Sequence, residues 1–162
     1  MLLSDVVKLE FDALIKERGL STTLEFKELP MGILAMAYLS CRQDEETGEV
    51  VEMVIAQNII AVDITNMHMA MFMTDVYTEE ETRTYVRMVL LHEIRHLQQG
   101  SDASVKQSCI DRINALFVGM TAMEARHLGV DLTLSVLEPD ADEYVNSNGS
   151  FAEIAMLKRV RG

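Results

Sequence analysis

Residues 90–99 read Leu-Leu-His-Glu-Ile-Arg-His-Leu-Gln-Gln and contain the pattern His-Glu-x-x-His. Four residues of an α-helix turn slightly more than once around its axis, so His92 and His96 project from the same face. Their imidazoles can hold two corners of a tetrahedral Zn²⁺ ion, and Glu93 lies beside the metal, where it can accept a proton from bound water. We therefore expect a metal site on a helix, with the rest of the chain arranged around it.

Both ends of this helix are marked in the sequence. Thr78 and Glu81 have the spacing of a capping box, which satisfies the first backbone N–H groups of a helix. No Pro or Gly follows until Gly100, a residue type that often ends helices. The pattern therefore predicts a helix over 79–99, with the two histidines in its second half.

The composition is that of an ordinary globular protein. Of the 162 residues, 49% are apolar and 25% are charged, and we expect a single domain over 1–162. The 26 acidic and 14 basic residues give a net charge of −12, which disfavours binding to nucleic acid or to an anionic membrane. Charges interrupt every apolar run well short of the about 18 residues that a membrane span needs. No oligomeric state follows from the sequence.

Two further features predict a cytoplasmic protein. Residues 1–5 have neither a basic start nor a long apolar run, so we predict no secretion signal. The two cysteines, Cys41 and Cys109, both lie inside apolar segments. We expect them to be buried thiols in a reducing compartment rather than a disulfide framework.

The first 65 residues predict one helix and three or four strands. Ser4 is placed to cap a helix that ends at Arg18, before Gly19. Polar residues 43–49 predict a hairpin loop. Runs typical of strands lie at 22–29, 33–42, 50–57 and 58–65, the last being a fourth strand or a continuation of the third.

Residues 67–73 carry a methionine at every second position. Thioethers in such a row can bind a soft metal such as Cu(I). We favour the simpler interpretation of a strand edge or core segment filled by flexible side chains. His68 has no partner at helical spacing, so we do not expect it to bind a metal.

Helices are predicted after the motif. Asp102 is placed to cap a long one, with apolar residues at three- and four-residue steps up to Met123 and Gly129 as its stop. A link over 130–137 leads to a helix with Pro139 at its first position.

The last helix is predicted from Ser150 and Glu153, a capping box that follows the break at Asn148-Gly149. The whole order predicts an α+β fold. It consists of an N-terminal helix, a small, mostly antiparallel sheet of three or four strands, then the His-Glu-x-x-His helix and further helices.

A second motif lies downstream. Glu138-x-x-Ala141-Asp142 resembles the Glu-x-x-Ala-Asp/Asn signature that follows His-Glu-x-x-His in gluzincin metallopeptidases. The layout is similar to the small minigluzincin form often met in phage and prophage proteins, including its His-Glu-x-Arg-His-x-x-Gln variant. The two motifs span His92 to Asp142, and the rest of the chain is similar in element order alone.

The resemblance implies a role for each matching residue. His92, His96 and Glu138 would bind zinc, Glu93 would be the general base, and Asp142 would orient a ligand histidine. Pro139 disfavours helical geometry at the residue before it, which would place Glu138 at the helix cap. Asp140 or Asp142 is then the alternative third ligand.

The function implied is a zinc-dependent peptidase of narrow specificity, acting on a peptide or protein substrate. Such folds bind the substrate along a sheet edge, for which we predict Ile59–Ile64. His127 and Tyr144 are candidates to stabilise an oxyanion, although His127 can instead complement a helix dipole. Two alternatives stay open: a weakly active or inactive metal-binding domain that binds a partner protein, and buried histidines without a metal.

Overall fold

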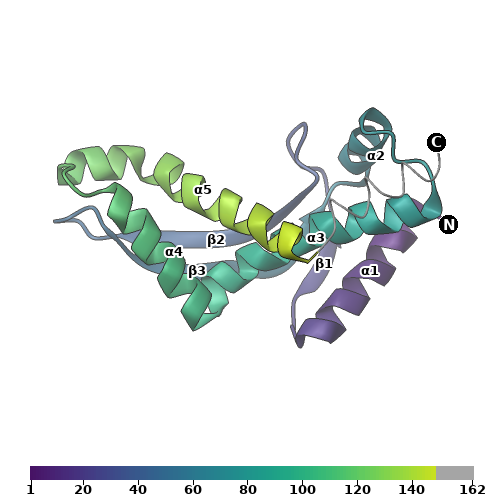
Figure 1. The fold of residues 1–162 in the computed structure, drawn as a ribbon, viewed down its shortest axis with the longest axis horizontal. Helices are drawn as coiled ribbons and strands as arrows, with labels where there is room; N and C mark the ends of the chain where they lie inside the picture. The colour runs from purple at the N-terminus through teal and green to yellow at the C-terminus, as the bar shows by residue number, and fades with distance from the viewer. Residues whose placement is uncertain (149–162) are drawn as a thin grey trace.

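The computed structural model describes residues 1–148. These residues form five helices and three strands, in the order α1 (Leu3–Arg18), β1 (Thr23–Phe26), β2 (Ala35–Gln43), β3 (Val50–Val62), α2 (Ile64–Met73), α3 (Glu79–Ser101), α4 (Ala103–Leu116) and α5 (Ala122–Ser147). The predicted α+β class is confirmed: an N-terminal helix, a mostly antiparallel sheet and then helices (Figure 1). Among residues 1–148, no helix is both long and apolar enough to cross a membrane.

The sheet has the order β1-β3-β2. β2 and β3 form an antiparallel hairpin, and β1 pairs in parallel with the end of β3, where Thr23 lies opposite Ile59 and Phe26 opposite Val62. Residues 58–62 therefore continue the third strand instead of forming a fourth. The predicted substrate edge at Ile59–Ile64 is wrong, because β3 is the central strand and, among residues 1–148, β2 and β1 are the edges.

α3 is the helix on which the other elements pack. It contacts β2, β3, α1, α4 and α5 (Figure 1). Its apolar face is fully buried at Leu90, Leu91 and Ile94, where removal from water stabilises the fold. The predicted start is confirmed, since Thr78 Oγ1 accepts the N–H of Glu81 at 3.1 Å. The Glu81 carboxylate accepts the N–H of Tyr77 rather than completing the box at Thr78.

Gly100 does not end α3, which continues to Ser101. A Cβ at Gly100 would lie 2.6 Å from Leu39 Cδ2 and 3.1 Å from the backbone nitrogen of Ile55. The glycine is therefore needed where the helix approaches the hairpin closely, and not for a turn. The predicted helix stop was wrong for this reason.

The helices after α3 differ from those predicted. α4 ends at Leu116, and a short connection leads to Thr121, whose side chain accepts the N–H of Glu124 and caps α5. The predicted stop at Gly129 and link over 130–137 are wrong, because both lie inside α5. A Cβ at Gly129 would lie 2.6 Å from the Gln43 side chain, so this glycine also serves a close approach.

Pro139 lies inside α5 and not at the first position of a helix, as we had predicted. A proline inside a helix cannot donate a backbone hydrogen bond to the preceding turn. The helix nonetheless continues to Ser147, with Leu137, Ala141 and Val145 buried at four-residue steps. Packing of this face holds the helix together across the proline. The predicted last helix, from Ser150 and Glu153, lies outside the described residues.

The methionine-rich segment is helical and not a strand. Asp63 caps α2, and Met67 and Met71 are buried one helical turn apart, whereas Met69 and Met73 are exposed. Because methionines two positions apart lie on different faces of the helix, half of them face the core and half face the solvent. His68 is exposed.

Two smaller predictions were also wrong. Ser4 lies within α1, whose N-cap residue is Leu2 and has no side-chain cap, although the end at Gly19 is confirmed by its φ of 62°. Backbone N–H groups of the first turn bond to Leu2 instead. Cys109 is buried as predicted, but Cys41, near the end of β2, is exposed.

Candidate metal centre

Three of the predicted ligands converge. His92 and His96 of α3 and Glu138 of α5 each offer one ligand atom, and these atoms lie within 4.8 Å of one another. Glu138 Oε2 is 2.9 Å from His92 Nε2, and Glu138 Oε1 is 3.0 Å from His96 Nε2. The two Nε2 atoms are 3.1 Å apart. Residues 46 positions apart in the chain thus present one compact set of donors.

Helix geometry accounts for this convergence. The two histidines are one turn apart on α3, and α5 packs against α3 through its buried Leu137 and Ala141. Glu138 and Asp142 each follow one of these buried residues, so they lie at the edge of the helix–helix interface. The predicted position of Glu138 at a helix cap is wrong, since Glu138 lies inside α5.

The three side chains form a paired cluster of opposite charges. Hydrogen bonds from both histidines hold the pKa of Glu138 well below its usual range. Burial works against charging the imidazoles, but the hydrogen bonds with Glu138 raise the pKa of His92 and His96 above the usual 6.5. Two imidazole nitrogens and a carboxylate oxygen are a donor set that suits Zn²⁺ and related divalent metals better than Ca²⁺ or Mg²⁺. The described residues therefore fit a metal ion.

Glu93 lies next to the cluster with only 8% of its surface exposed. The backbone N–H of Ala37 in β2 donates to Glu93 Oε2 at 2.8 Å, which fixes the carboxyl against the edge strand. Burial raises the pKa of Glu93 to about 7. A carboxyl with such a pKa can accept and return a proton near neutral pH.

Asp142 lies beside the His92 ring, on the opposite side from Glu138. Its Oδ1 is 3.1 Å from His92 Nδ1, whereas Nε2 of the same ring faces Glu138. The carboxylate can therefore accept a hydrogen bond from Nδ1–H and leave Nε2 for a metal. This is the arrangement expected of a residue that orients a ligand.

Asp140 faces away from the histidines. Its oxygens lie 2.8 Å from Arg95 Nε and 2.9 Å from Arg112 Nη2, and Gln99 Nε2 donates to it at 2.9 Å. Burial raises its pKa, but these hydrogen bonds outweigh burial and lower it to about 2. The geometry does not support Asp140 as the third ligand.

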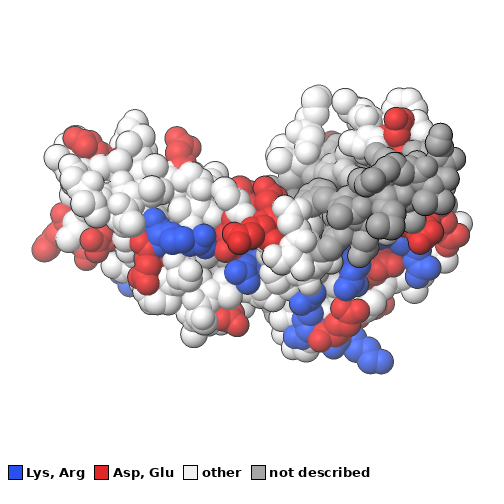
Figure 2. Space-filling model, in the orientation of Figure 1, with Lys and Arg blue, Asp and Glu red and all other residues white. Residues whose placement is uncertain are grey.

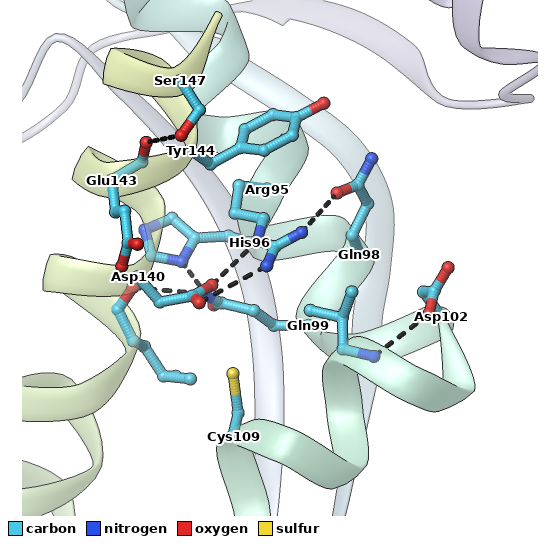
Figure 3. A network of polar contacts seen from close by, with 12 residues as sticks. Arg95, His96, Gln98, Gln99, Asp102, Cys109, Asp140, Glu143, Tyr144 and Ser147 are labelled. Atoms are coloured by element: carbon cyan, nitrogen blue, oxygen red, sulfur yellow. Dashed lines mark hydrogen bonds and ion pairs between the residues drawn. The ribbon is translucent and has the colours of Figure 1, made fainter. Parts of the chain in front are cut away.

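Sequence reasoning missed the residues behind the cluster. Figure 3 shows Arg95, Gln99 and Asp140 joined in one network beside His96, whose Nδ1 lies 2.8 Å from Gln99 Oε1. Arg95 and Gln99 match the Arg and the Gln of the His-Glu-x-Arg-His-x-x-Gln variant, but the resemblance implied no role for either residue. The available signal was spacing, because Gln99 follows His96 by three residues and so lies on the same face.

The two predicted oxyanion-stabilising residues are not at the cluster. The Tyr144 ring lies close to the guanidinium groups of Arg18 and Arg95, 5.4 Å and 5.0 Å from its centre, and its buried hydroxyl has no partner among residues 1–148. His127 is exposed near the start of α5, roughly 16 Å along the helix from Glu138. Neither His127 nor Tyr144 lines the groove that borders the cluster.

A groove of about 810 Å³ runs between β2, α3 and α5 and has the cluster in its wall. Apart from His92, Glu93, His96 and Glu138, its lining is mainly apolar, and includes Ala35, Ala37, Leu39, Tyr85, Met88, Val130, Leu134 and Leu137. Figure 2 shows acidic side chains gathered near the C-terminal end of α5, where the surface is hollowed. The site thus combines a polar wall with an elongated apolar space.

Comparison with family models, with curated proteins and with solved structures finds no match for this chain. The resemblance to gluzincins therefore stays a prediction carried by the two motifs.

Proposed function

We propose that this protein is a zinc-dependent peptidase. The observation that carries the proposal is the convergence of His92, His96 and Glu138 in the wall of a groove that also holds Glu93. A zinc ion held there would polarise the scissile carbonyl and lower the pKa of water towards about 7. The three side chains would hold the metal through one atom each.

Glu93 is the general base of the proposed reaction. It takes a proton from the attacking water and passes it to the leaving amine. Its raised pKa of about 7 suits both steps, since the group must bind the proton and release it again. The hydrogen bond from Ala37 keeps the carboxyl in place between the two steps.

The substrate of this proposal is an extended peptide bound along β2. Among residues 1–148, β2 has a strand neighbour on one side only, and its residues Ala35 to Gln43 form one side of the groove. A peptide can add to such an edge through backbone hydrogen bonds, with alternate side chains entering the groove. Away from the cluster, the lining favours apolar side chains of the substrate, because a charged one would lose its water without gaining a partner.

Glu93→Gln tests the reaction. The wild type should contain about one zinc per chain by elemental analysis and should cleave members of a fluorogenic peptide library. The variant should keep the zinc and lose activity by about 100-fold to 10,000-fold. Full activity of Glu93→Gln would refute the role of the base, and zinc-free wild type after zinc-replete purification would refute the metal site.

The second candidate is a metal-binding domain that holds a partner without cleaving it. The apolar lining of the groove favours it as much as it favours a substrate, because that lining binds a segment whether or not chemistry follows. Bound zinc, no product from any library peptide and one stoichiometric partner in a pull-down would select this alternative.

A further inference from the structure

His96, the second histidine of the cluster, forms its outer hydrogen bond with an amide and not with a carboxylate. His96 Nδ1 lies 2.8 Å from Gln99 Oε1, and Gln99 is fully buried. An amide oxygen only accepts hydrogen bonds, so this contact requires a proton on Nδ1. The contact therefore depends on an amide orientation in which the oxygen, rather than the nitrogen, faces the imidazole.

Two acceptors determine the orientation of the amide. Gln99 Nε2 donates to the backbone oxygen of Leu137 at 3.0 Å and to Asp140 Oδ2 at 2.9 Å, which uses both of its protons. In the reversed orientation, the amide oxygen would face these two acceptors and no donor. Unpaired polar groups in a buried place cost about 1–3 kcal/mol each, so the observed orientation is strongly favoured.

Asp140 is itself held in place. Arg95 and Arg112 donate to its two oxygens at 2.8 Å and 2.9 Å, and Arg95 also lies against the ring of Tyr144 (Figure 3). Guanidinium groups keep their charge at any pH that a protein tolerates, so Asp140 stays an anion and an acceptor. The arginines thus fix Asp140, Asp140 fixes Gln99, and Gln99 fixes the proton on His96.

We propose that Gln99, supported by Asp140, is a positioning residue that commits His96 to bind the metal through Nε2. With the proton held on Nδ1, the lone pair on Nε2 faces Glu138 and His92, where the other ligand atoms lie. The inference rests on the proposed metal site. It gives His96 a neutral partner and His92 a charged one, Asp142. Asp140 then has a role at the site without being a ligand.

Zinc affinity is the first test, measured by competition with a chelating dye. Gln99→Leu keeps the volume but removes the acceptor, and should weaken zinc binding by about 10-fold to 100-fold. The matched control is Gln98→Leu, whose side chain bonds Arg95 but not the histidine, and it should bind zinc as the wild type does. Asp140→Asn leaves Gln99 in place but allows its amide to reverse, and should weaken binding too. Equal affinity of Gln99→Leu and Gln98→Leu would overturn the proposal.

The second test reads the proton directly and needs no variant to fold. In zinc-loaded protein with ¹⁵N-labelled histidine, two-bond ¹H–¹⁵N correlations should show His96 with a protonated Nδ1 and a metal-bound Nε2. The Nδ1 proton should exchange slowly with water, because Gln99 buries and bonds it. Metal on Nδ1, or rapid exchange of that proton, would refute the inference while leaving the metal site intact. Wild type without zinc would instead refute the proposed function.

Discussion

Glu138 and Asp140 are two carboxylates two residues apart on one helix, yet they belong to different environments. The Glu138 side chain is 49% exposed and faces two imidazoles, whereas the Asp140 side chain is 9% exposed and lies between two guanidinium groups. Hydrogen bonds from their cationic partners lower the pKa of both carboxyls. The two carboxylates differ in the chemistry of these partners, which are imidazoles for Glu138 and guanidinium groups for Asp140.

An imidazole can lose its proton and become a metal ligand, but a guanidinium cannot. A carboxylate among histidines can therefore join them in binding a metal, whereas one among arginines is already neutralised by partners that bind no metal. The ability of the neighbours to lose a proton separates the metal-facing Glu138 from Asp140 in the network behind it.

The largest expected effect is loss of metal from the histidine-facing group. Glu138→Ala, His92→Ala and His96→Ala each remove one of three protein ligands, and should lower zinc affinity by well over the about 100-fold that outer partners cost. Elemental analysis after dialysis measures this loss. Glu143→Ala, an exposed carboxylate on the same helix, is the control and should keep its zinc. If Glu138→Ala stays fully loaded while Asp140→Ala is empty, the assignment of the two carboxylates is reversed.

Glu93 gives a third case, a buried carboxyl whose pKa is raised to about 7 from 4.5. The native state then holds its proton more tightly than the unfolded chain, so the group costs stability as pH rises from about 4 to 7. Glu93→Gln removes this cost and should stabilise the metal-free protein at pH 8 by about 3 kcal/mol.

Urea unfolding of the metal-free protein at pH 4 and pH 8 measures this effect. The gain should nearly vanish at pH 4, where the carboxyl is protonated in both states. A gain of equal size at both pH values would show that packing, and not the raised pKa, causes it.

Asp140→Ala should lower the free energy of unfolding more than the loss of an exposed ion pair does. It leaves Arg95 and Arg112 without their carboxylate, and Arg112 is partly exposed, so we expect a loss of about 2–3 kcal/mol, below the about 3–5 kcal/mol of a fully buried pair. Urea unfolding of the metal-free protein measures it. Glu52→Ala, which breaks the exposed pair with Arg42, should cost at most about 1 kcal/mol. Similar losses in both variants would contradict a special role for Asp140.

Local geometry made part of this molecule predictable. His92 and His96 lie on one face because an α-helix places residues four apart together, and Thr78 marks the start of α3. The α+β order followed from strand-like runs before the motif and helix-like runs after it. The approach of Glu138 required the downstream motif, because no local rule states which part of α5 packs on α3.

The errors came from residues with more than one physical use. Gly100 and Gly129 were both interpreted as helix stops, and both lie inside helices where a Cβ would collide with the β2–β3 hairpin. The presence of a glycine in a sequence does not reveal whether it is needed for a turn or for the close approach of another segment. Gln99 was given no role, and Asp140 was considered only as an alternative ligand, because the roles of both depend on partners from another helix.

The smallest expected effect concerns Asp142, which contacts the cluster without belonging to it. Its Oδ1 lies 3.1 Å from His92 Nδ1, and its side chain is 62% exposed. Asp142→Ala should weaken zinc binding by about 10-fold to 100-fold, because water can partly replace the acceptor but does not fix the ring.

Asp142→Asn separates charge from hydrogen bonding at the same position. The amide oxygen can still accept a hydrogen bond from Nδ1–H, as Gln99 Oε1 does for His96, so this variant should bind zinc more tightly than Asp142→Ala. Dye competition on both variants measures the difference. Equal weakening would show that His92, unlike His96, depends on the negative charge of its partner. Full affinity of Asp142→Ala would instead show that the exposed carboxylate does not orient the ring, and that Gln99 alone among these partners positions a ligand.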